Sequence, residues 1–290
     1  MRVGFISTGT NNVMAVINSA KCIPEFKRIE TLIFSHQVGR NQNPNIADWA
    51  RNERLDYIFF IGSAAGTDPA PEHFIAIKHM NIPCYHICFD GGDKPWWPRL
   101  ELYKQQCLFD LQVNIDGLKG NPCDLTTLCP LNPDDFNPLT KKTIPFGFAG
   151  NIKSAVRSNL VRQLQNGGYI QVRVRDAAVD SFKDYCNFLN NCSGMLNISY
   201  TGTGKAHHVK ARILEGMYAG CVLVEDERAP TKEYFVQGID YLSYNGTSES
   251  VIRAINATGV VLTDRIREKA IDLYGPRAFY KQILGKGILA

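Results

Sequence analysis

Two ionisable side chains three positions apart suggest the clearest chemistry in this sequence. The apolar pattern predicts a helix over 207–219, and at 100° per residue Arg212 and Glu215 share one of its faces with His208. The guanidinium of Arg212 offers a planar fork of donors to a phosphate, and the carboxylate of Glu215 can accept hydrogen bonds from ribose hydroxyls. Ala219 leaves room on the same face for a flat ligand. The pattern therefore favours a nucleotide.

The same spacing has a second interpretation. Arg212 and Glu215 can also form a solvated pair on the helix surface, and an i, i+3 pair of this kind contributes only about 0.3 kcal/mol. The spacing alone does not decide between these two interpretations.

Two strands must hold this helix. The segments 195–199 and 221–225 are apolar and flank it, and Gly220 fits the left-handed position that ends many helices. The helix would turn a broad apolar face to the sheet, formed by Val209, Ile213, Leu214, Met217 and Tyr218. These segments predict a strand–helix–strand unit of a parallel sheet.

The N-terminal half repeats this alternation. Strands are predicted over 2–7, 29–35, 55–62, 84–90 and 111–115. Helices are predicted over 13–20, 46–54, 71–80 and 98–107. This rhythm predicts a doubly wound parallel sheet, in which ligands bind beyond the carboxyl ends of the strands.

Two loops at those strand ends are small and polar. Thr8, Gly9 and Thr10 lead into a helix whose first amides would face an anion or a sugar hydroxyl. The loop lacks the three-glycine dinucleotide fingerprint, which counts against an NAD(P) enzyme. The other loop, 62–68, fits an ordinary turn at least as well as a binding loop.

A third loop, 90–98, has an unusual composition. It contains two carboxylates and two adjacent tryptophans, Asp90, Asp93, Trp96 and Trp97. Aromatic rings stack on the apolar faces of sugars while carboxylates bind their hydroxyls, so the loop suits an acceptor site with Asp90 as a general base. In the alternative interpretation, the tryptophans anchor the following helix and Asp93 pairs with a neighbouring basic residue.

One strand carries side chains that ligate metals elsewhere. Cys84, His86, Cys88 and Asp90 alternate along it and so share one face. Ligands on a single strand are splayed, and no second Cys/His pair complements them. We therefore predict no metal site.

The second half begins after a segment rich in proline and asparagine, 120–145, which predicts a linker. A strand over 145–150 then leads to a helix that begins near basic residues. The basic residues at this turn are Lys153 and Arg157. Because cations oppose the dipole at a helix start, an anion is their natural partner. Thr231 near a later helix start and a helical tail over 248–289 complete the pattern.

Composition bounds the class of protein. The chain has 290 residues, 44% of them apolar, which is enough for two domains. The formal charge of +4 is spread along the chain, so it suits a small anionic substrate and makes nucleic acid an unlikely partner. No apolar stretch reaches membrane-spanning length, and the nine cysteines lack the spacing of a disulfide scaffold. We expect a soluble, cytoplasmic protein with reduced thiols.

Four ordered segments resemble the C-terminal domain of glycosyltransferases with the GT-B fold, of the glycosyl transferases group 1 type. They read Leu-Asn-Ile-Ser over 196–199, Lys-Ala-Arg-Ile-Leu-Glu over 210–215, Ala-Gly-Cys-Val-Leu-Val-Glu-Asp over 219–226, and Glu-Tyr-Phe-Val-Gln-Gly at the start of 233–244. The series is most similar to the CgeB-like branch, which has a comparable Arg-x-x-Glu run followed by a Tyr-Phe segment.

This resemblance implies two Rossmann-like, doubly wound parallel-sheet domains that face a central cleft. The acceptor-side domain would cover 1–140, the nucleotide-sugar donor domain 141–270, and a C-terminal helix over 271–290 would return to the first domain. The implied activity is metal-independent transfer of a hexosyl or pentosyl group from a UDP or GDP sugar to a hydroxyl of a glycan or other acceptor, without a further cofactor.

The resemblance also implies roles for residues. Glu215 would bind the ribose and Tyr200 the base, while the candidates for catalysis are Asp90, His207 and Glu215. The expected contacts with the donor, mostly through its diphosphate, are Gly150, Asn151, Lys153, Arg157, Lys205, His208, Lys210, Arg212 and Thr231. The basic residues between Lys205 and Arg212 would neutralise the leaving diphosphate, which gains negative charge as it departs.

One position departs from the large retaining GT-B family. That family carries a second glutamate eight positions before the one that matches Glu215, and here the position is His207. Stereochemistry is therefore left undetermined. Two alternatives stay open: a catalytically inactive protein of this fold that binds nucleotide sugars or glycans, and a glucosyltransferase that acts on a DNA base.

Overall fold

The computed structural model describes the chain except residues 9–10, 35–44, 63–67, 153, 175–180, 201–205, 259–262, 286 and 290, and except the side chains of 11–13 and 263–264. The chain divides into two compact units. Unit 1 comprises Met1–Asn132 and Pro276–Ala290, and unit 2 comprises Pro133–Gly275.

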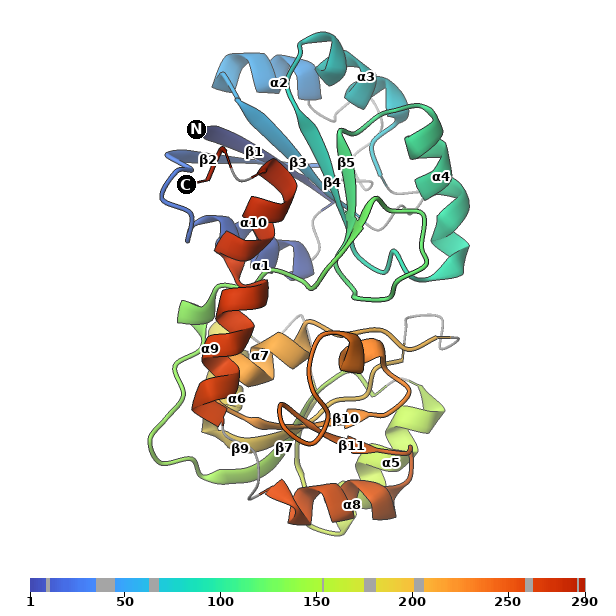
Figure 1. Cartoon of the computed structure of the whole chain (residues 1–290), viewed down its shortest axis with the longest axis vertical. Coiled ribbons are helices and arrows are strands. Elements are labelled where there is room, and N and C mark those ends of the chain that lie inside the picture. The colour runs from blue at the N-terminus through green and yellow to red at the C-terminus, as the bar shows by residue number, and fades with distance from the viewer. Residues whose placement is uncertain are drawn as a thin grey trace. The chain divides into compact units, whose positions relative to one another are not determined.

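Unit 1 is built on a parallel sheet with the strand order β2-β1-β3-β4-β5-β6 among the described residues (Figure 1). The strands are β1 (Arg2–Ser7), β2 (Arg28–Ile33), β3 (Tyr57–Gly62), β4 (Cys84–Cys88), β5 (Leu111–Asn114) and β6 (Leu125–Thr126). β1 pairs with β2 on one side and with β3 on the other, so the strand order reverses at β1. Such a reversal of strand order is where doubly wound sheets bind ligands.

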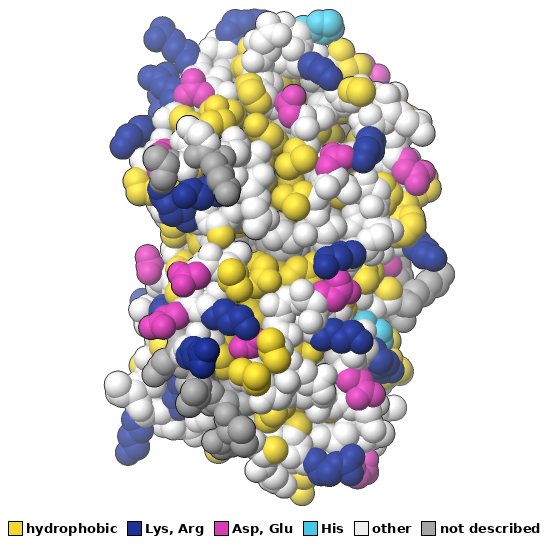
Figure 2. Space-filling model, in the orientation of Figure 1, with side chains coloured by type: hydrophobic (Ala, Val, Ile, Leu, Met, Phe, Trp, Pro, Cys, Tyr) yellow, Lys and Arg dark blue, Asp and Glu magenta, His cyan; other side chains and the backbone are white. Residues whose placement is uncertain are grey.

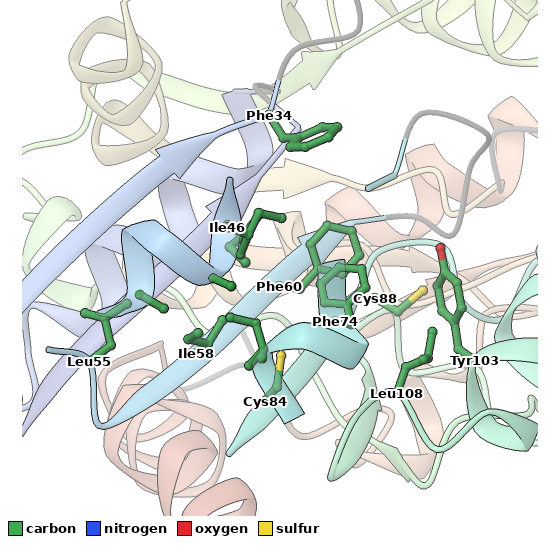
Figure 3. Close-up of a cluster of buried hydrophobic side chains, with 14 of the residues drawn as sticks. Phe34, Ile46, Leu55, Ile58, Phe60, Phe74, Cys84, Cys88, Tyr103 and Leu108 are labelled. Atoms are coloured by element: carbon green, nitrogen blue, oxygen red, sulfur yellow. The ribbon is translucent and has the colours of Figure 1, made fainter. Parts of the chain in front are cut away.

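Helices cover both faces of the unit 1 sheet. On one face lie α2 (Ile46–Glu53), α3 (Pro71–His79) and α4 (Trp97–Gln105), and Figure 3 shows the buried cluster beneath them, which includes Phe60 and Phe74. Phe59 alternates to the other face, where its ring lies 5.6 Å from that of Tyr280 on α10 (Pro276–Leu284). The Tyr280 hydroxyl also donates to the Val16 carbonyl of α1 (Asn11–Ala20) at 3.4 Å. The central strands β1, β3 and β4 are thus buried on both sides, as their continuously apolar sequences predict.

Unit 2 has its own parallel sheet, with the order β11-β10-β9-β7-β8 among the described residues. The strands are β7 (Ile144–Gly150), β8 (Gln171–Val174), β9 (Cys192–Leu196), β10 (Val222–Asp226) and β11 (Leu242–Tyr244). The two sheets confirm the predicted fold class of two doubly wound parallel-sheet domains.

The helices of unit 2 also lie on two sides of its sheet. One core cluster joins α5 (Ala155–Asn166) and α8 (Ser248–Asn256) to strand residues such as Phe148 and Val224. Elsewhere α7 (Arg212–Tyr218) packs against the sheet so closely that a Cβ at Gly216 would meet Leu223 at 2.6 Å. The remaining helices are α6 (Phe182–Asn191) and α9 (Thr263–Tyr274).

The start of α7 corrects one prediction. The helix begins at Arg212 and not at 207, because Tyr200 and His207 form an antiparallel bridge and the His208 amide donates to the Ser199 carbonyl at 3.0 Å. His208 therefore does not share a helix face with Arg212 and Glu215, as the sequence pattern predicted. Gly220 does have the predicted left-handed backbone, with φ of 65°.

The predicted linker over 120–145 is also partly wrong. Its first part belongs to unit 1, because β6 pairs with β5 inside it. The Asp124 carboxylate fixes this pairing by accepting the Gln112 amide at 3.0 Å. Side-chain hydrogen bonds of this kind leave no periodic signal in the sequence.

Candidate functional site

The polar side chains of unit 2 gather at the carboxyl edge of its sheet. Gly150 ends β7, Asn197 and Ser199 follow β9, and Asp226 ends β10. Because the strands are parallel, these ends meet at one edge. The first turns of α5 and α7 lie after the same strand ends along the chain.

Arg212, the first residue of α7, lies directly against the backbone of Gly150. A Cβ built on Gly150 would be 2.9 Å from the guanidinium carbon, and Gly150 has φ of 153°. The guanidinium also lies 5.9 Å from the centre of the Phe148 ring. Its Nη1 is buried and has no hydrogen-bond partner among the described residues. Because any side chain at position 150 would displace the Arg212 guanidinium, the contact between the two residues requires glycine.

Arg157, in the first turn of α5, is a second half-buried cation beside Arg212. Its guanidinium donates to the carbonyls of Asn151, at 2.8 Å, and Ile198, at 3.4 Å. Burial and then the positive charge of Arg212 lower the pKa of Arg157. Its Nε is buried without a partner in the described part of the chain.

Neither guanidinium forms an ion pair with a carboxylate of the described residues. Two like charges that are partly removed from water repel each other and lose hydration, so the arrangement is unfavourable unless an anion binds there. The N–H groups left over by Arg157 and Arg212 are therefore suited to phosphate oxygens.

Glu215 follows Arg212 by one helical turn and is 8% exposed. Its carboxylate accepts a hydrogen bond from the hydroxyl of Tyr185, a buried residue of α6. The carboxylate is thus oriented by a neighbouring helix and does not extend into solvent. The sequence analysis missed Tyr185, which no motif distinguishes from a core aromatic residue.

Tyr200 and His207 lie together after β9, with ring centroids 4.3 Å apart. The Nδ1 atom of His207 is 3.8 Å from a carboxylate oxygen of Asp226. Burial lowers the pKa of His207, and Asp226 partly opposes this effect. The imidazole is thus favoured in its neutral form near pH 7.

Asp226 and Arg228 are further residues that the sequence analysis did not select. Two nitrogens of the Arg228 guanidinium donate to the Asp226 carboxylate, at 2.8 and 2.6 Å. The same guanidinium lies 5.4 Å from the centre of the Tyr200 ring and donates to its hydroxyl at 3.2 Å. The guanidinium of Arg228 therefore joins the Asp226 carboxylate to the Tyr200 side chain.

The other predicted donor contacts in unit 2 differ in burial. Asn151 is exposed, Lys210 is half-buried, and His208 is 3% exposed. Thr231 lies in a short helix that Pro230 starts, is fully buried, and has a hydroxyl without a hydrogen-bond partner among the described residues. The predicted contacts Gly9, Thr10, Lys153 and Lys205 lie outside the described residues.

The predicted acceptor residues lie in unit 1. Asp90 has a left-handed backbone, with φ of 57°, and Asp93 is 3% exposed. Trp96 and Trp97 are half-buried against the core cluster of Figure 3, and the Trp97 indole donates to the Gly91 carbonyl at 3.1 Å. These are the contacts that the anchoring interpretation expects, while a role in acceptor binding stays a prediction. Thr8, after β1, is half-buried.

The cysteine-rich strand β4 lies in the core of unit 1. His86 stacks on Phe60 with ring centroids 5.1 Å apart and contacts Gln112 through Nδ1 at 3.3 Å. Burial raises the pKa of the Cys84 thiol. In the described part of the chain no group of three or more His, Cys, Asp or Glu side chains could hold a metal ion.

None of the helices among the described residues has the length and hydrophobicity that crossing a bilayer requires. No family model matches the chain, and no curated protein matches it. The narrower resemblance to the CgeB-like branch therefore stays a prediction.

Solved structures do match the whole chain. HepE of Anabaena, solved with UDP and glucose, is 11% identical, with 98% of each chain covered and a TM-score of 0.65. AviGT4, a glycosyltransferase involved in avilamycin A biosynthesis, is 12% identical, with 99% of this chain and 97% of that chain covered and a TM-score of 0.59. An alpha-glucosyltransferase solved with UDP-glucose and DNA containing an abasic site is 9% identical, with both chains fully covered and a TM-score of 0.56. With its two parallel-sheet units, the chain has the GT-B fold of these glycosyltransferases.

Proposed function

We propose that this protein is a glycosyltransferase that moves a sugar from a nucleoside diphosphate donor to an acceptor hydroxyl. One observation carries the proposal: Arg157 and Arg212 are adjacent, half-buried and without a carboxylate partner among the described residues, at the carboxyl edge of a parallel sheet, and each has one buried nitrogen that lacks a hydrogen-bond partner there. A diphosphate supplies the missing negative charge and matches the planar forks of both side chains. The GT-B fold supports the same reaction class.

In this proposal the donor binds unit 2. Arg157 and Arg212 contact the diphosphate, with Gly150 and Asn151 beside them. Lys153, Lys205, His208, Lys210 and Thr231 are further candidate contacts. The two guanidiniums stabilise the charge that develops on the leaving diphosphate, which lets the reaction proceed without a metal ion.

The nucleoside binds through the side chains that follow. Glu215, oriented by Tyr185, accepts the ribose hydroxyls, and the Tyr200 ring packs against the base. We propose a uridine or guanosine donor and favour uridine, because HepE was solved with UDP and glucose. His207 lies near the leaving phosphate, and its neutral imidazole donates a hydrogen bond to it.

The acceptor binds unit 1. Asp90 acts as the base on the acceptor hydroxyl, and Asp93, Trp96 and Trp97 bind the acceptor, which is a glycan or another hydroxyl compound. Whether the transferred group is a hexose or a pentose follows from the donor that binds. The nine free thiols fit the cytoplasmic location that we propose.

The test is calorimetric titration of UDP, GDP and their glucose conjugates into the wild-type protein and single variants. We expect Arg212→Ala and Arg157→Ala each to weaken binding of UDP-glucose about 100-fold, since each removes charged hydrogen bonds to phosphate. The matched control is Arg162→Ala, an exposed arginine on the same helix as Arg157, which should leave the affinity unchanged.

Binding and turnover separate the proposed enzyme from the inactive alternative. An active enzyme releases UDP from UDP-glucose when a suitable acceptor is present. A protein that binds UDP-glucose through Arg212 but releases no UDP with a panel of glycan acceptors is the inactive binding protein. Unchanged affinity in Arg157→Ala and Arg212→Ala contradicts the donor site itself.

A glucosyltransferase that acts on DNA remains the less favoured candidate. A structural neighbour was solved with DNA, but acidic and basic side chains are mixed over the face shown in Figure 2. Duplex DNA that serves as an acceptor, with binding that weakens steeply as salt rises, would identify this alternative.

A further inference from the structure

Glu225 is the most deeply buried carboxylate at the carboxyl edge of unit 2 and has no role in the reaction outlined above. It is fully buried near the end of β10. One carboxylate oxygen accepts the Ser199 hydroxyl and the Asp226 amide, the latter at 2.8 Å. The other accepts the side-chain amide of Asn197 at 2.6 Å. The carboxylate therefore ties the segment after β9 to the end of β10.

Both segments continue into the candidate donor site. The Ser199 carbonyl accepts the His208 amide at 3.0 Å, which fixes the bridge between Tyr200 and His207. On the other side, the Asp226 carboxylate holds Arg228 against Tyr200. Glu225 is thus hydrogen-bonded to Ser199 and to Asp226, which belong to the two segments that position the Tyr200 ring.

We propose that Glu225 is a positioning residue that sets the arrangement of Tyr200, His207 and Arg228, and that its protonation changes this arrangement and weakens donor binding. The inference rests on the proposed function, because it assigns donor binding to these residues. No contact between Glu225 and the donor is involved.

The chemistry of the carboxyl group provides the mechanism. Burial raises the pKa of Glu225 to about 7, against hydrogen bonds from Ser199 and Asn197 that lower it. The ionised carboxylate accepts all three surrounding donors. The protonated form must itself donate an O–H, so one of these bonds is lost or the Ser199 hydroxyl turns.

The other titratable groups near Glu225 do not account for a rearrangement with a midpoint near pH 7. Tyr241 and Tyr244 stay neutral, because burial and the nearby carboxylates raise the pKa of both phenols, that of Tyr241 to about 12. Asp226 is held by Arg228. His207 lies beyond Asp226 and burial lowers its pKa, and because Glu225→Gln leaves His207 in place, any transition that survives in the variant belongs to His207.

The first experiment needs no ligand. In NMR spectra of the free protein between pH 5.5 and 8.5, we expect the side-chain amide of Asn197 and the backbone amides of Asp226, Tyr200 and His207 to shift with one common midpoint near 7. Glu225→Gln should abolish this transition. The control Glu227→Gln changes an exposed glutamate two positions away and should keep it. If the Tyr200 and His207 signals do not follow the titration seen at Asn197, the positioning role is wrong.

The second experiment measures the affinity for UDP-glucose, whose diphosphate does not titrate in this range. We expect the wild-type affinity to fall about 10-fold from pH 8 to pH 6, a loss typical of one hydrogen bond to a charged group. Glu225→Gln should show the low affinity at both pH values, while Glu227→Gln should behave as the wild type does. Equal affinities for Glu225→Gln and the wild type at pH 8 would overturn the proposal.

Together the two experiments separate a failure of the positioning role of Glu225 from a failure of the proposed function. If the wild-type protein binds no UDP-glucose at any pH, the proposed function fails in its uridine form, and the ligand-free titration alone decides the positioning role. If Glu225→Gln does not fold, the wild-type titration at Asn197, Tyr200 and His207 still decides it.

Discussion

The carboxyl edges of the two sheets have the same backbone plan and opposite chemistry. In unit 1 the buried Asp116 accepts the backbone amides of Gly92 and Leu118, each at 2.9 Å, so its charge is used to hold a loop. In unit 2 the half-buried cations Arg157 and Arg212 each keep one buried nitrogen without a partner among the described residues. In both units the doubly wound sheet places polar groups at its carboxyl edge. The difference between the units indicates that this edge can bind a ligand only where its polar groups still lack hydrogen-bond partners within the protein.

The largest test of this comparison uses pH, because the two units bury titratable groups of opposite kind. Burial lowers the pKa of His86 in unit 1 from 6.5 to about 4, so its stabilising effect is present above pH 6.5 and is lost as the pH falls toward 4. Burial raises the pKa of Glu225 in unit 2 from 4.5 to about 7, so its effect is present below pH 4.5 and is lost as the pH rises through 7. Each effect is on the order of 3 kcal/mol.

Hydrogen exchange of core amides, read separately for β3 in unit 1 and β10 in unit 2, measures the two responses. Acidification from pH 7.5 to pH 5 should loosen unit 1 and stabilise unit 2, and Glu225→Gln should flatten only the response of unit 2. The same sign of change in both units would contradict the comparison.

The next largest effect is expected from Asp116→Ala. It removes the acceptor of two backbone amides and the side-chain amide of Asn114, so unit 1 should lose about 2 kcal/mol of stability. Urea denaturation measures the loss, and the exposed Glu101→Ala is the control. The affinity for UDP-glucose should stay unchanged, because the donor is assigned to unit 2. A loss of donor affinity at full stability would refute that division.

Gly150→Ala tests the cluster of cations at the carboxyl edge of unit 2. The new methyl group would meet the Arg212 guanidinium at 2.9 Å, so we expect about 10-fold weaker binding of UDP-glucose by titration. Gly168→Ala is the matched control: Gly168 also has a positive φ, of 74°, but a Cβ there has nothing within 4 Å. It should cost stability and not affinity. Equal effects of the two variants on affinity would mean that backbone strain, and not the displaced guanidinium, is responsible.

The smallest effect is expected from Trp97→Phe, which removes the hydrogen bond to the Gly91 carbonyl. Unit 1 should lose about 1 kcal/mol of stability in urea denaturation, with donor affinity unchanged. Trp49→Phe, another half-buried tryptophan of the same core cluster, is the control. If Trp97→Phe also raises the KM for the acceptor and Trp49→Phe does not, the edge of unit 1 has a binding role beside its structural one.

Much of the fold follows from local pattern. The alternation of apolar strands and helices predicted both parallel sheets, and most strands of unit 1 lie within two residues of the predicted ends. The cluster at the carboxyl edge of unit 2 was anticipated in part, since Arg212 was selected from its type and spacing, and Arg157 and Tyr200 through the family resemblance, while their role in donor binding stays a prediction. The start of α7 was not, because the bridge between Tyr200 and His207 competes with helical hydrogen bonds and is formed by tertiary contacts.

By itself, therefore, the sequence determined the architecture and the kinds of side chain at each strand end, because period and turn chemistry are local properties. Only the tertiary structure decided which of those side chains meet. It placed Arg157 beside Arg212, Tyr185 on Glu215, and Glu225 between Asn197 and Ser199. The physical reason is burial: a polar group acquires its partner, its pKa and its role only when packing brings distant segments together and removes water from between them.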